Sequence, residues 1–249
     1  MNALRAAGLS KRFGGLAALT DVSMSLPAGA RHALIGPNGA GKTTLINVLA
    51  GALAPSSGAV LLGEESITHL PQHRRVKRGL TRTFQINTLF PGLTVLESVV
   101  LAILERKGLA ARWWRPVAAY REEADEARSL LATLRLEGEA HRRTAQLPYG
   151  RQRLVEIALG LATRPRILLL DEPAAGIPAA ESIEVLGVIA RLPAEVSVLF
   201  IEHDMGLVFR FAERITVLVG GRVLTEGAPD DVRRDARVKA VYLGDNPHG

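Results

Sequence analysis

Apolar positions divide the chain into a strand-rich beginning, a helical middle and an end in which strands and helices alternate. Short apolar segments at residues 4–9, 21–26, 31–35 and 59–62 have the length and the flanking turn residues of β-strands. The first two are joined by Gly14-Gly15, a turn signal. A helical pattern at residues 43–51 ends at Gly51, because glycine commonly stops a helix.

The middle of the chain lacks strand patterns. Residues 93–105, 118–136 and 150–162 each repeat apolar positions with helical spacing. No strand pattern lies between residues 90 and 163. This block predicts a helical subdomain that is inserted into the rest of the fold.

Buried-strand patterns return after residue 166. Residues 167–170 are a continuous apolar run, which is typical of a strand buried on both faces of a parallel sheet, and residues 196–201 form a second one. We also expect a helix at 179–192, a hairpin at 215–219 and 222–225, and a helical tail at 229–243. Alternating strands and helices predict one α/β domain over 1–249, with its core in 1–89 and 164–249 and its helical insert in 90–163.

Composition narrows the class of protein. The chain has 249 residues, of which 47% are hydrophobic, enough for one core or one core with a subdomain. It contains no Cys, which excludes disulfides and thiolate metal sites. No run reaches the ~18 apolar residues of a membrane span, and the first residues lack a secretory signal pattern. We therefore expect a protein that is soluble, or peripheral to a membrane through a partner.

The net charge of +6 would suit nucleic acid, anionic lipid or nucleotide phosphates as partners. No basic run is interleaved with aromatic residues, however, as a surface for single-stranded nucleic acid requires. A general bias toward Arg explains the charge more simply, so we expect no nucleic-acid partner.

The chemistry begins in the turn between the strand at 31–35 and the helix at 43–51. This turn matches the G-x-x-x-x-G-K-[ST] phosphate-binding loop at every fixed position. Glycines let the backbone approach closely, and N–H groups at the helix start point at the β- and γ-phosphates. Lys42 adds a positive charge and Thr43 a hydroxyl for Mg²⁺. The alternative is a glycine-rich turn with a surface lysine. The residues of the expected nucleotide site are Gly36, Pro37, Asn38, Gly39, Ala40, Gly41, Lys42, Thr43 and Thr44.

Two acidic residues, Asp171 and Glu172, follow the apolar run at 167–170. Ligands bind at the carboxyl ends of strands in open α/β sheets, so Asp171 is placed for the Mg²⁺ shell. Glu172 is placed to polarise a water for attack on the γ-phosphorus. His203 follows the next buried strand and would face the same crevice. Taken alone, the two acids could be solvated residues at a strand end, and a single His is usually structural. The phosphate-binding loop upstream favours a catalytic role for these residues.

Three further candidates have weaker signals. Gln85 lies where the core gives way to the helical block, and its carbonyl could touch Mg²⁺ or the water; alone, an ordinary polar residue is the better interpretation. Gly150, between Tyr149 and Arg151, begins a helix whose first N–H groups are free for an anion. One nucleotide does not need two phosphate sites, which suggests that the second serves another copy. Phe13 could stack on a purine or belong to the core.

Together these elements resemble the ATPase subunit of ATP-binding-cassette (ABC) transporters, in family order over nearly the whole chain. The resemblance implies a P-loop NTPase core of RecA type with a parallel sheet, an N-terminal antiparallel β-subdomain and an inserted helical subdomain. It also implies that two cassettes sandwich two ATP molecules. Each ATP would lie between the Walker A loop of one chain and the signature helix of the other, which would explain the second anion site.

The resemblance also assigns roles to individual residues. The magnesium ligands would be Thr43 and Gln85, with Asp171 in the outer shell. The catalytic residues would act on the γ-phosphate and its water, and comprise Lys42, Gln85, Glu172 and His203.

Two stretches depart from the common family pattern. The usual signature Leu-Ser-Gly-Gly-Gln is replaced by residues 147–151, in which Pro148 stands where a serine hydroxyl would meet the partner's γ-phosphate. The usual Ser-Ala-Leu-Asp after the Walker B acids is replaced by residues 174–177, which lack the Asp. Both departures resemble the branched-chain amino-acid uptake subfamily, whose signature is typically Leu-Ala-Tyr-Gly-Gln. Residues 13–16, 201–205 and 241–244 resemble that subfamily too.

The resemblance implies an ATP-hydrolysing subunit that drives uptake of branched-chain or related amino acids, bound peripherally at the cytoplasmic face of the inner membrane. Its partners would be permease subunits, a second ABC ATPase of identical or homologous sequence and, indirectly, an extracytoplasmic solute-binding protein. Gln85 and Phe90-Pro91 would border the permease groove. Residues 112–115 are a candidate partner or lipid contact, or else pack between two helices of the subdomain. The alternatives are the same ATPase serving urea, short amides or lipopolysaccharide export, and a soluble cassette acting on ribosomes or DNA.

Overall fold

The structure is a computed structural model that describes residues 2–83, 90–109 and 120–244. Gln85 and residues 112–115 lie outside the described residues. No helix in the described part of the chain is long and apolar enough to cross a membrane.

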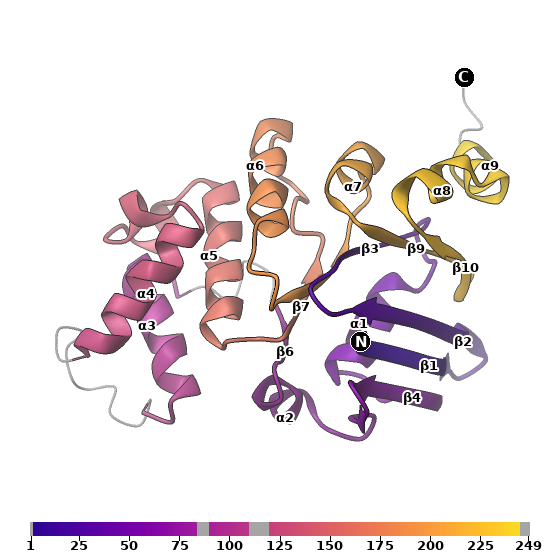
Figure 1. Ribbon diagram of the computed structural model, residues 1–249, viewed down its shortest axis with the longest axis horizontal. Coiled ribbons are helices and arrows are strands. Elements are labelled where there is room, and N and C mark those ends of the chain that lie inside the picture. The colour runs from indigo at the N-terminus through magenta and orange to yellow at the C-terminus, as the bar shows by residue number, and fades with distance from the viewer. Residues whose placement is uncertain (1, 84–89, 110–119, 245–249) are drawn as a thin grey trace.

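A mostly parallel sheet forms the centre of the fold (Figure 1). Its strands in the described ranges are β3 (Arg31–Ile35), β6 (Leu80–Arg82), β7 (Ile167–Asp171), β8 (Ser197–Ile201), β9 (Arg214–Val219) and β10 (Arg222–Gly227). They lie in the order β10-β9-β3-β8-β7-β6, and all neighbours run parallel except the hairpin of β9 and β10. The predicted α/β class and the parallel central sheet are confirmed.

An antiparallel sheet lies beside the central one. Within the described residues it consists of β1 (Asn2–Phe13), β2 (Leu16–Pro27), β4 (Ser57–Leu62) and β5 (Glu65–Ser66), in the order β2-β1-β4-β5. The predicted turn at Gly14-Gly15 joins β1 to β2, and both strands are longer than predicted.

Successive residues of the central strands pack on opposite faces of the sheet, because side chains alternate along a strand. On β7, Leu168 and Leu170 pack into one apolar cluster and Ile167 and Leu169 into another. The first cluster lies under most of the helices, and the second lies between the central sheet, the antiparallel sheet and α1 (Lys42–Ala50). Burial on both faces explains why the strand reads as an unbroken apolar run.

The other helices follow in the described parts of the chain. They are α2 (Gln72–Lys77), α3 (Val95–Arg106), α4 (Arg121–Thr133), α5 (Tyr149–Ala162), α6 (Ala179–Ala190), α7 (Met205–Phe211), α8 (Pro229–Arg234) and α9 (Ala236–Gly244). Helices α3, α4 and α5 pack together at the side of the molecule away from β1 and β2 (Figure 1). Described residues 90–109 and 120–163 contain no strand, which agrees with the predicted helical block, whereas the domain boundaries remain a prediction.

Four short elements were not predicted from the sequence, because two to seven residues are too few to show a clear pattern. They are β5, α2, β6 and α7. The tail was predicted as one helix but forms two. Helix α8 ends before Asp235, whose carboxylate accepts the N–H of Arg237 at 2.8 Å in the first turn of α9. Such local side-chain bonds compete with continuation of a helix.

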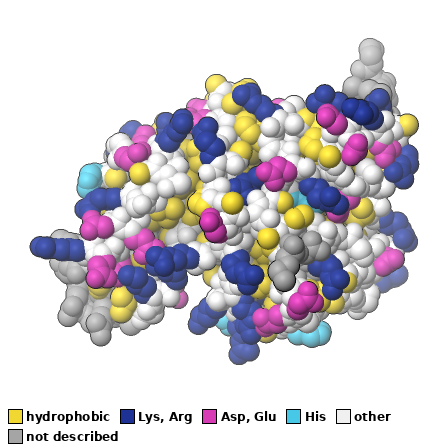
Figure 2. All heavy atoms as spheres, in the orientation of Figure 1, with side chains coloured by type: hydrophobic (Ala, Val, Ile, Leu, Met, Phe, Trp, Pro, Cys, Tyr) yellow, Lys and Arg dark blue, Asp and Glu magenta, His cyan; other side chains and the backbone are white. Residues whose placement is uncertain are grey.

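The net charge is not gathered in one patch on the face shown in Figure 2. Lys and Arg side chains alternate there with Asp and Glu side chains. This distribution gives that face no continuous basic track for nucleic acid.

The carboxyl end of α1 is closed by a buried arginine from α2. Arg75 is 1% exposed and donates to the carbonyl oxygens of Val48 and Leu49 at 2.9 and 2.7 Å. It also donates to those of Thr68 and Leu70, each at 2.8 Å. Desolvation lowers the pKa of its guanidinium to about 10, so Arg75 stays charged at neutral pH. Because α1 has no basic residue in its own last turn, Arg75 supplies the positive charge that favours a helix end.

Arg75→Met should therefore destabilise the protein. The substitution keeps an apolar stem but leaves buried carbonyl oxygens without donors, and we expect the free energy of unfolding to fall by about 2–4 kcal/mol. Urea unfolding followed by circular dichroism measures it. Arg78→Met is the matched control, because Arg78 forms an exposed ion pair with Glu65; its loss should cost less than about 1 kcal/mol. Equal losses in the two variants would contradict the capping role.

Candidate functional site

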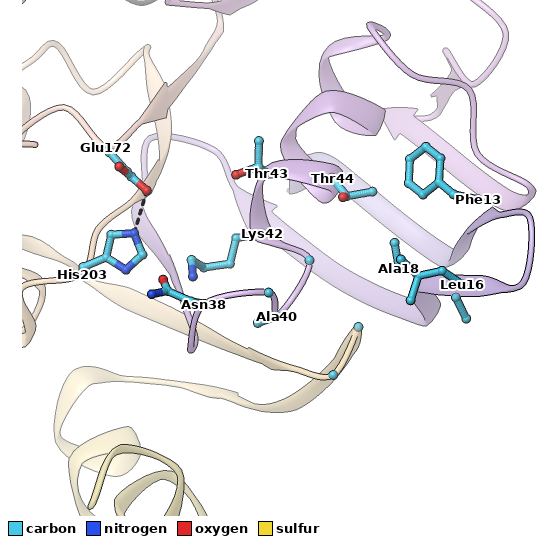
Figure 3. Close-up of a pocket in the computed structure, with 15 residues that line it drawn as sticks. Phe13, Leu16, Ala18, Asn38, Ala40, Lys42, Thr43, Thr44, Glu172 and His203 are labelled. Atoms are coloured by element: carbon cyan, nitrogen blue, oxygen red, sulfur yellow. Dashed lines mark hydrogen bonds and ion pairs between the residues drawn. The ribbon is translucent and has the colours of Figure 1, made fainter. Parts of the chain in front are cut away.

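Three segments that are distant in sequence meet at one edge of the central sheet. Strands β3, β8 and β7 are parallel neighbours, so their carboxyl ends lie side by side. The glycine-rich loop follows β3, Glu172 follows β7 and His203 lies two residues beyond β8. They share a pocket of about 510 Å³ (Figure 3). Its lining residues are Phe13, Leu16, Ala17, Ala18, Asn38, Gly39, Ala40, Gly41, Lys42, Thr43, Thr44, Glu172, His203, Gly220 and Gly221.

The loop keeps its shape through backbone conformations that favour glycine. Gly39 and Gly41 have φ angles of 76° and 99°, in the left-handed region. A Cβ on Gly41 would also lie 2.6 Å from the carbonyl oxygen of Ala18 on β2. Helix α1 begins directly after Gly41 and has no acidic residue in its first turn, so the positive end of its dipole faces the pocket without a counter-charge of its own.

Lys42 brings a largely buried positive charge to the loop. Its side chain is held by the carbonyl oxygens of Gly36 and Pro37, at 2.7 and 3.0 Å from Nζ, and the residue is 6% exposed. Burial lowers its pKa, and the nearby carboxylates of Glu172 and Asp171 act in the opposite direction. A lysine in this position offers its charge to an anion in the pocket.

Glu172 and His203 meet at one end of the pocket, and Phe13 and Leu16 lie at the other (Figure 3). His203 Nε2 is 2.6 Å from Glu172 Oε1, and both side chains are partly exposed. Glu172 has a φ of 50°, a left-handed conformation that is uncommon for a residue with a side chain. The pocket therefore has an acid–histidine end, a middle formed by the glycine-rich loop and Lys42, and an apolar end.

Phe13 is not a core residue. It is 48% exposed, and the ammonium of Lys11 lies 5.1 Å from its ring centroid. The ring is thus available for stacking on a planar ligand.

Asp171 is paired with an arginine that sequence reasoning missed. Arg82 on β6 donates to Asp171 Oδ2 at 2.7 Å, and both side chains are mostly buried. Arg82 also bonds Oδ1 of Asn47 on α1, so it ties three elements together beneath the pocket. The sequence offers little signal for it, because β6 has only three residues and the partners of Arg82 lie 35 and 89 residues away.

The oxygen donors at the site fit Mg²⁺. Thr43 lines the pocket and Asp171 is the last residue of β7, and hydroxyl and carboxylate oxygens suit this ion. The described residues contain no group of three or more His, Asp or Glu side chains that could hold a metal by themselves.

The predicted signature residues lie elsewhere. Gly150 and Arg151 line a separate cavity of about 210 Å³ with Pro148, Leu154, Glu181, Glu184 and Val185. Tyr149 is 42% exposed at the start of α5. A single chain thus does not bring this triplet into the pocket that contains Lys42.

The expectation of free N–H groups at the start of α5 is wrong for Gly150. Its N–H donates to Glu181 Oε2 at 3.1 Å, and Arg151 pairs with Glu184 at 3.2 Å. Pro148 precedes α5 and offers no side-chain acceptor, so a carboxylate from the first turn of α6 caps the helix instead. The position does attract an anion, here one from the same chain.

The fold and the pocket define a nucleotide-binding ATPase of the P-loop type. The profile of the ABC transporter family matches residues 19–175, and that of the branched-chain amino acid ATP-binding cassette transporter matches residues 222–248. The chain belongs to the ABC transporter family, as an ATP-binding cassette that hydrolyses ATP. This confirms the resemblance that its motifs indicate.

Two kinds of relative match the chain over nearly its whole length. The high-affinity branched-chain amino acid transport ATP-binding protein BraF of Pseudomonas aeruginosa is 40% identical, over 97% of this chain and 98% of that protein. LivG of Escherichia coli, with the same description, is 39% identical, over 96% of each chain. The lipopolysaccharide export system ATP-binding protein LptB of Acidithiobacillus ferridurans is 37% identical, over 97% of each chain.

Solved structures agree. A nucleotide-free ATP-binding cassette of an ABC transporter has a TM-score of 0.85 at 30% identity, covering 97% of this chain and 99% of that one. A dimeric cassette bound to ADP and Pi has a TM-score of 0.74 at 26% identity, covering 91% and 98%. Cassettes of this family dimerise and work with permease subunits, and are in that sense membrane-associated.

Gly41→Ala should weaken nucleotide binding. The added methyl group would meet the Ala18 carbonyl, and alanine disfavours the left-handed φ that this position has, so the loop must shift away from the phosphate positions. We expect the Kd for ATP to rise about tenfold or more, which corresponds to a loss of about 1.4 kcal/mol. Equilibrium binding of a fluorescent ATP analogue measures it. Gly138→Ala, where a Cβ meets nothing within 4 Å, is the control; unchanged affinity in Gly41→Ala would refute this account of the loop.

Proposed function

We propose that this chain is the ATPase subunit of an importer for branched-chain or related amino acids. The observation that carries the ATPase mechanism is the order of groups along the pocket, from Phe13 through the loop to Glu172 and His203. The cargo rests on the names of the 40% and 39% identical relatives and on the subfamily profile at the carboxyl end.

In this proposal the adenine base stacks on Phe13 and the triphosphate runs along the loop toward His203. Backbone N–H groups between Gly36 and Thr44, together with the Lys42 ammonium, hold the β- and γ-phosphates. Thr43 and Gln85 would hold Mg²⁺, and Asp171 would support it from the outer shell. When bound, the ion neutralises charge on the phosphate oxygens.

Glu172 and His203 complete the hydrolytic end. Glu172 polarises the attacking water and accepts its proton. His203, now 2.6 Å from Glu172, turns to donate a hydrogen bond to the γ-phosphate when ATP binds. The partial exposure of both side chains leaves them accessible to a ligand.

The far wall of the site comes from a second chain. Gly150 and Arg151 line a different cavity from Lys42, and Tyr149 at the start of α5 does not line the pocket of Lys42 either. This supports a role of the three residues toward the nucleotide of a partner. Glu181 would leave the Gly150 N–H when a phosphate arrives, because both anions use the same donor. The partner is an identical or homologous cassette.

The remaining partners follow from the importer role. Two permease subunits would hold the dimer at the cytoplasmic face of the inner membrane, near the border marked by Gln85, Phe90 and Pro91. An extracytoplasmic solute-binding protein would deliver cargo to the permease.

Glu172→Gln should bind ATP with normal affinity and lose turnover. The amide keeps the size of the side chain but is not a base, so we expect kcat to fall roughly 100-fold or more. Steady-state ATPase of the purified transporter measures it, with Glu195→Gln, a carboxyl outside the pocket, as the control. Near-normal turnover in Glu172→Gln would contradict the role of Glu172 as the catalytic base.

Cargo is tested by uptake. Cells that lack this subunit should lose uptake of labelled leucine and regain it when the wild-type gene, but not the Glu172→Gln gene, is restored. Urea uptake serves as the control and should not change. Normal leucine uptake combined with a loss of surface lipopolysaccharide would favour the export function instead, and co-purification with ribosomes or DNA rather than membranes would favour a soluble role.

A further inference from the structure

A buried carboxylate lies directly behind the hydrolytic end of the pocket. Glu202, between β8 and His203, is only 5% exposed. Its Oε1 accepts the N–H of Ala174 at 2.8 Å and its Oε2 accepts the N–H of His203 at 3.3 Å. One side chain therefore binds the two loops that carry Glu172 and His203.

The first of these bonds supports a strained turn. Glu172 has a φ of 50°, and its carbonyl accepts the N–H of Ala175 at 3.1 Å, which closes a turn around Ala174. A side-chain-bearing residue keeps a left-handed conformation only when its surroundings hold it there. The bond from Ala174 to Glu202 fixes the middle of that turn from behind, where solvent does not compete.

The second bond fixes the backbone position from which the His203 side chain extends. The direction of the ring depends on the backbone of His203, whose N–H points at Glu202. The ring then reaches Glu172 at 2.6 Å. The distance between Glu172 and His203 is thus set by two loops that share one anchor.

A charged group suits this task better than a neutral isostere. A carboxylate accepts hydrogen bonds through both oxygens, whereas a glutamine amide has one accepting oxygen and one donating nitrogen. Burial raises the pKa of Glu202, and the two N–H bonds act in the opposite direction by favouring the ionised form.

We propose that Glu202 is a positioning residue for ATP hydrolysis, which acts by holding the Glu172 turn and His203 at their working separation. The inference rests on the proposed roles of those two residues. It assigns Glu202 no contact with the nucleotide, because Glu202 does not line the pocket.

Glu202→Gln in the full chain, assembled with its transporter, tests this role. One of the two loops loses its acceptor, so we expect kcat to fall about tenfold to 100-fold, as misplacement of reacting groups commonly causes. The Kd for ATP should stay within about twofold of wild type, because the phosphate loop is untouched. Glu226→Gln is the matched control: Glu226 is a half-buried carboxylate that bonds Arg214 and Thr216 away from the pocket, and its loss should leave kcat unchanged.

A double-mutant cycle separates positioning from general damage to the fold. In a His203→Ala background, measured by single-turnover hydrolysis, Glu202→Gln should cost much less than it does alone, because half of the positioned pair is already gone. The same fold-loss in both backgrounds would overturn the proposal, as would wild-type kcat in Glu202→Gln. If the Gln variant does not fold, Glu202→Asp keeps the charge but is too short to bridge both loops; it should lose kcat without losing affinity, and wild-type kcat there would also overturn the proposal.

Different results would contradict the proposed function and the positioning role of Glu202. Normal turnover in Glu172→Gln rejects the proposed function itself. Lost turnover in Glu172→Gln together with normal turnover in both Glu202 variants rejects only the positioning role.

Discussion

The parallel pairing of β3, β8 and β7 is the constraint on which the site depends. Leu34 and Asp171 are both register partners of Ile201 on the strand between them, so backbone hydrogen bonds fix how far each strand extends. The strands end together, and the loops that follow them share one pocket. Because the strands are buried on both faces, a one-residue slip in register would move each side chain to the opposite face and disrupt the packing of both apolar clusters. The loops can therefore be short and polar while the sheet supplies their rigidity.

Buried or partly buried charged side chains bond backbone groups that lack partners in a helix or sheet. Arg75 meets carbonyl oxygens at the end of α1, Glu181 meets an N–H at the start of α5, and Glu202 meets two N–H groups in the loops beyond β7 and β8. In each case the side chain carries the charge opposite to the partial charge of the backbone groups that it bonds. The elements that surround the nucleotide site are thus fastened by side chains that do not line its pocket.

The separation of the two anion-binding regions gives the family's dimer a physical basis. The pocket at α1 has the loop and the acid–histidine pair, and the start of α5 lies in another cavity of the same chain. A carboxylate of the chain itself occupies the latter in this structure. In the proposed dimer, a phosphate of the partner's nucleotide would replace the Glu181 carboxylate at the Gly150 N–H. Nucleotide binding would then be linked to contact between chains.

The sequence by itself determined what local spacing can encode. The phosphate loop was predictable because its glycines are required by the backbone conformation of a single turn. Strands β7 and β8 were predictable because burial on both faces requires a continuous apolar run. Glu172 and His203 were predictable as residues at strand ends. Only the tertiary structure decided which distant side chains support them. Arg82, Glu181 and Glu202 act on groups 28 to 89 residues away, and hydrogen bonding of that kind depends on how elements pack, not on any pattern along the chain.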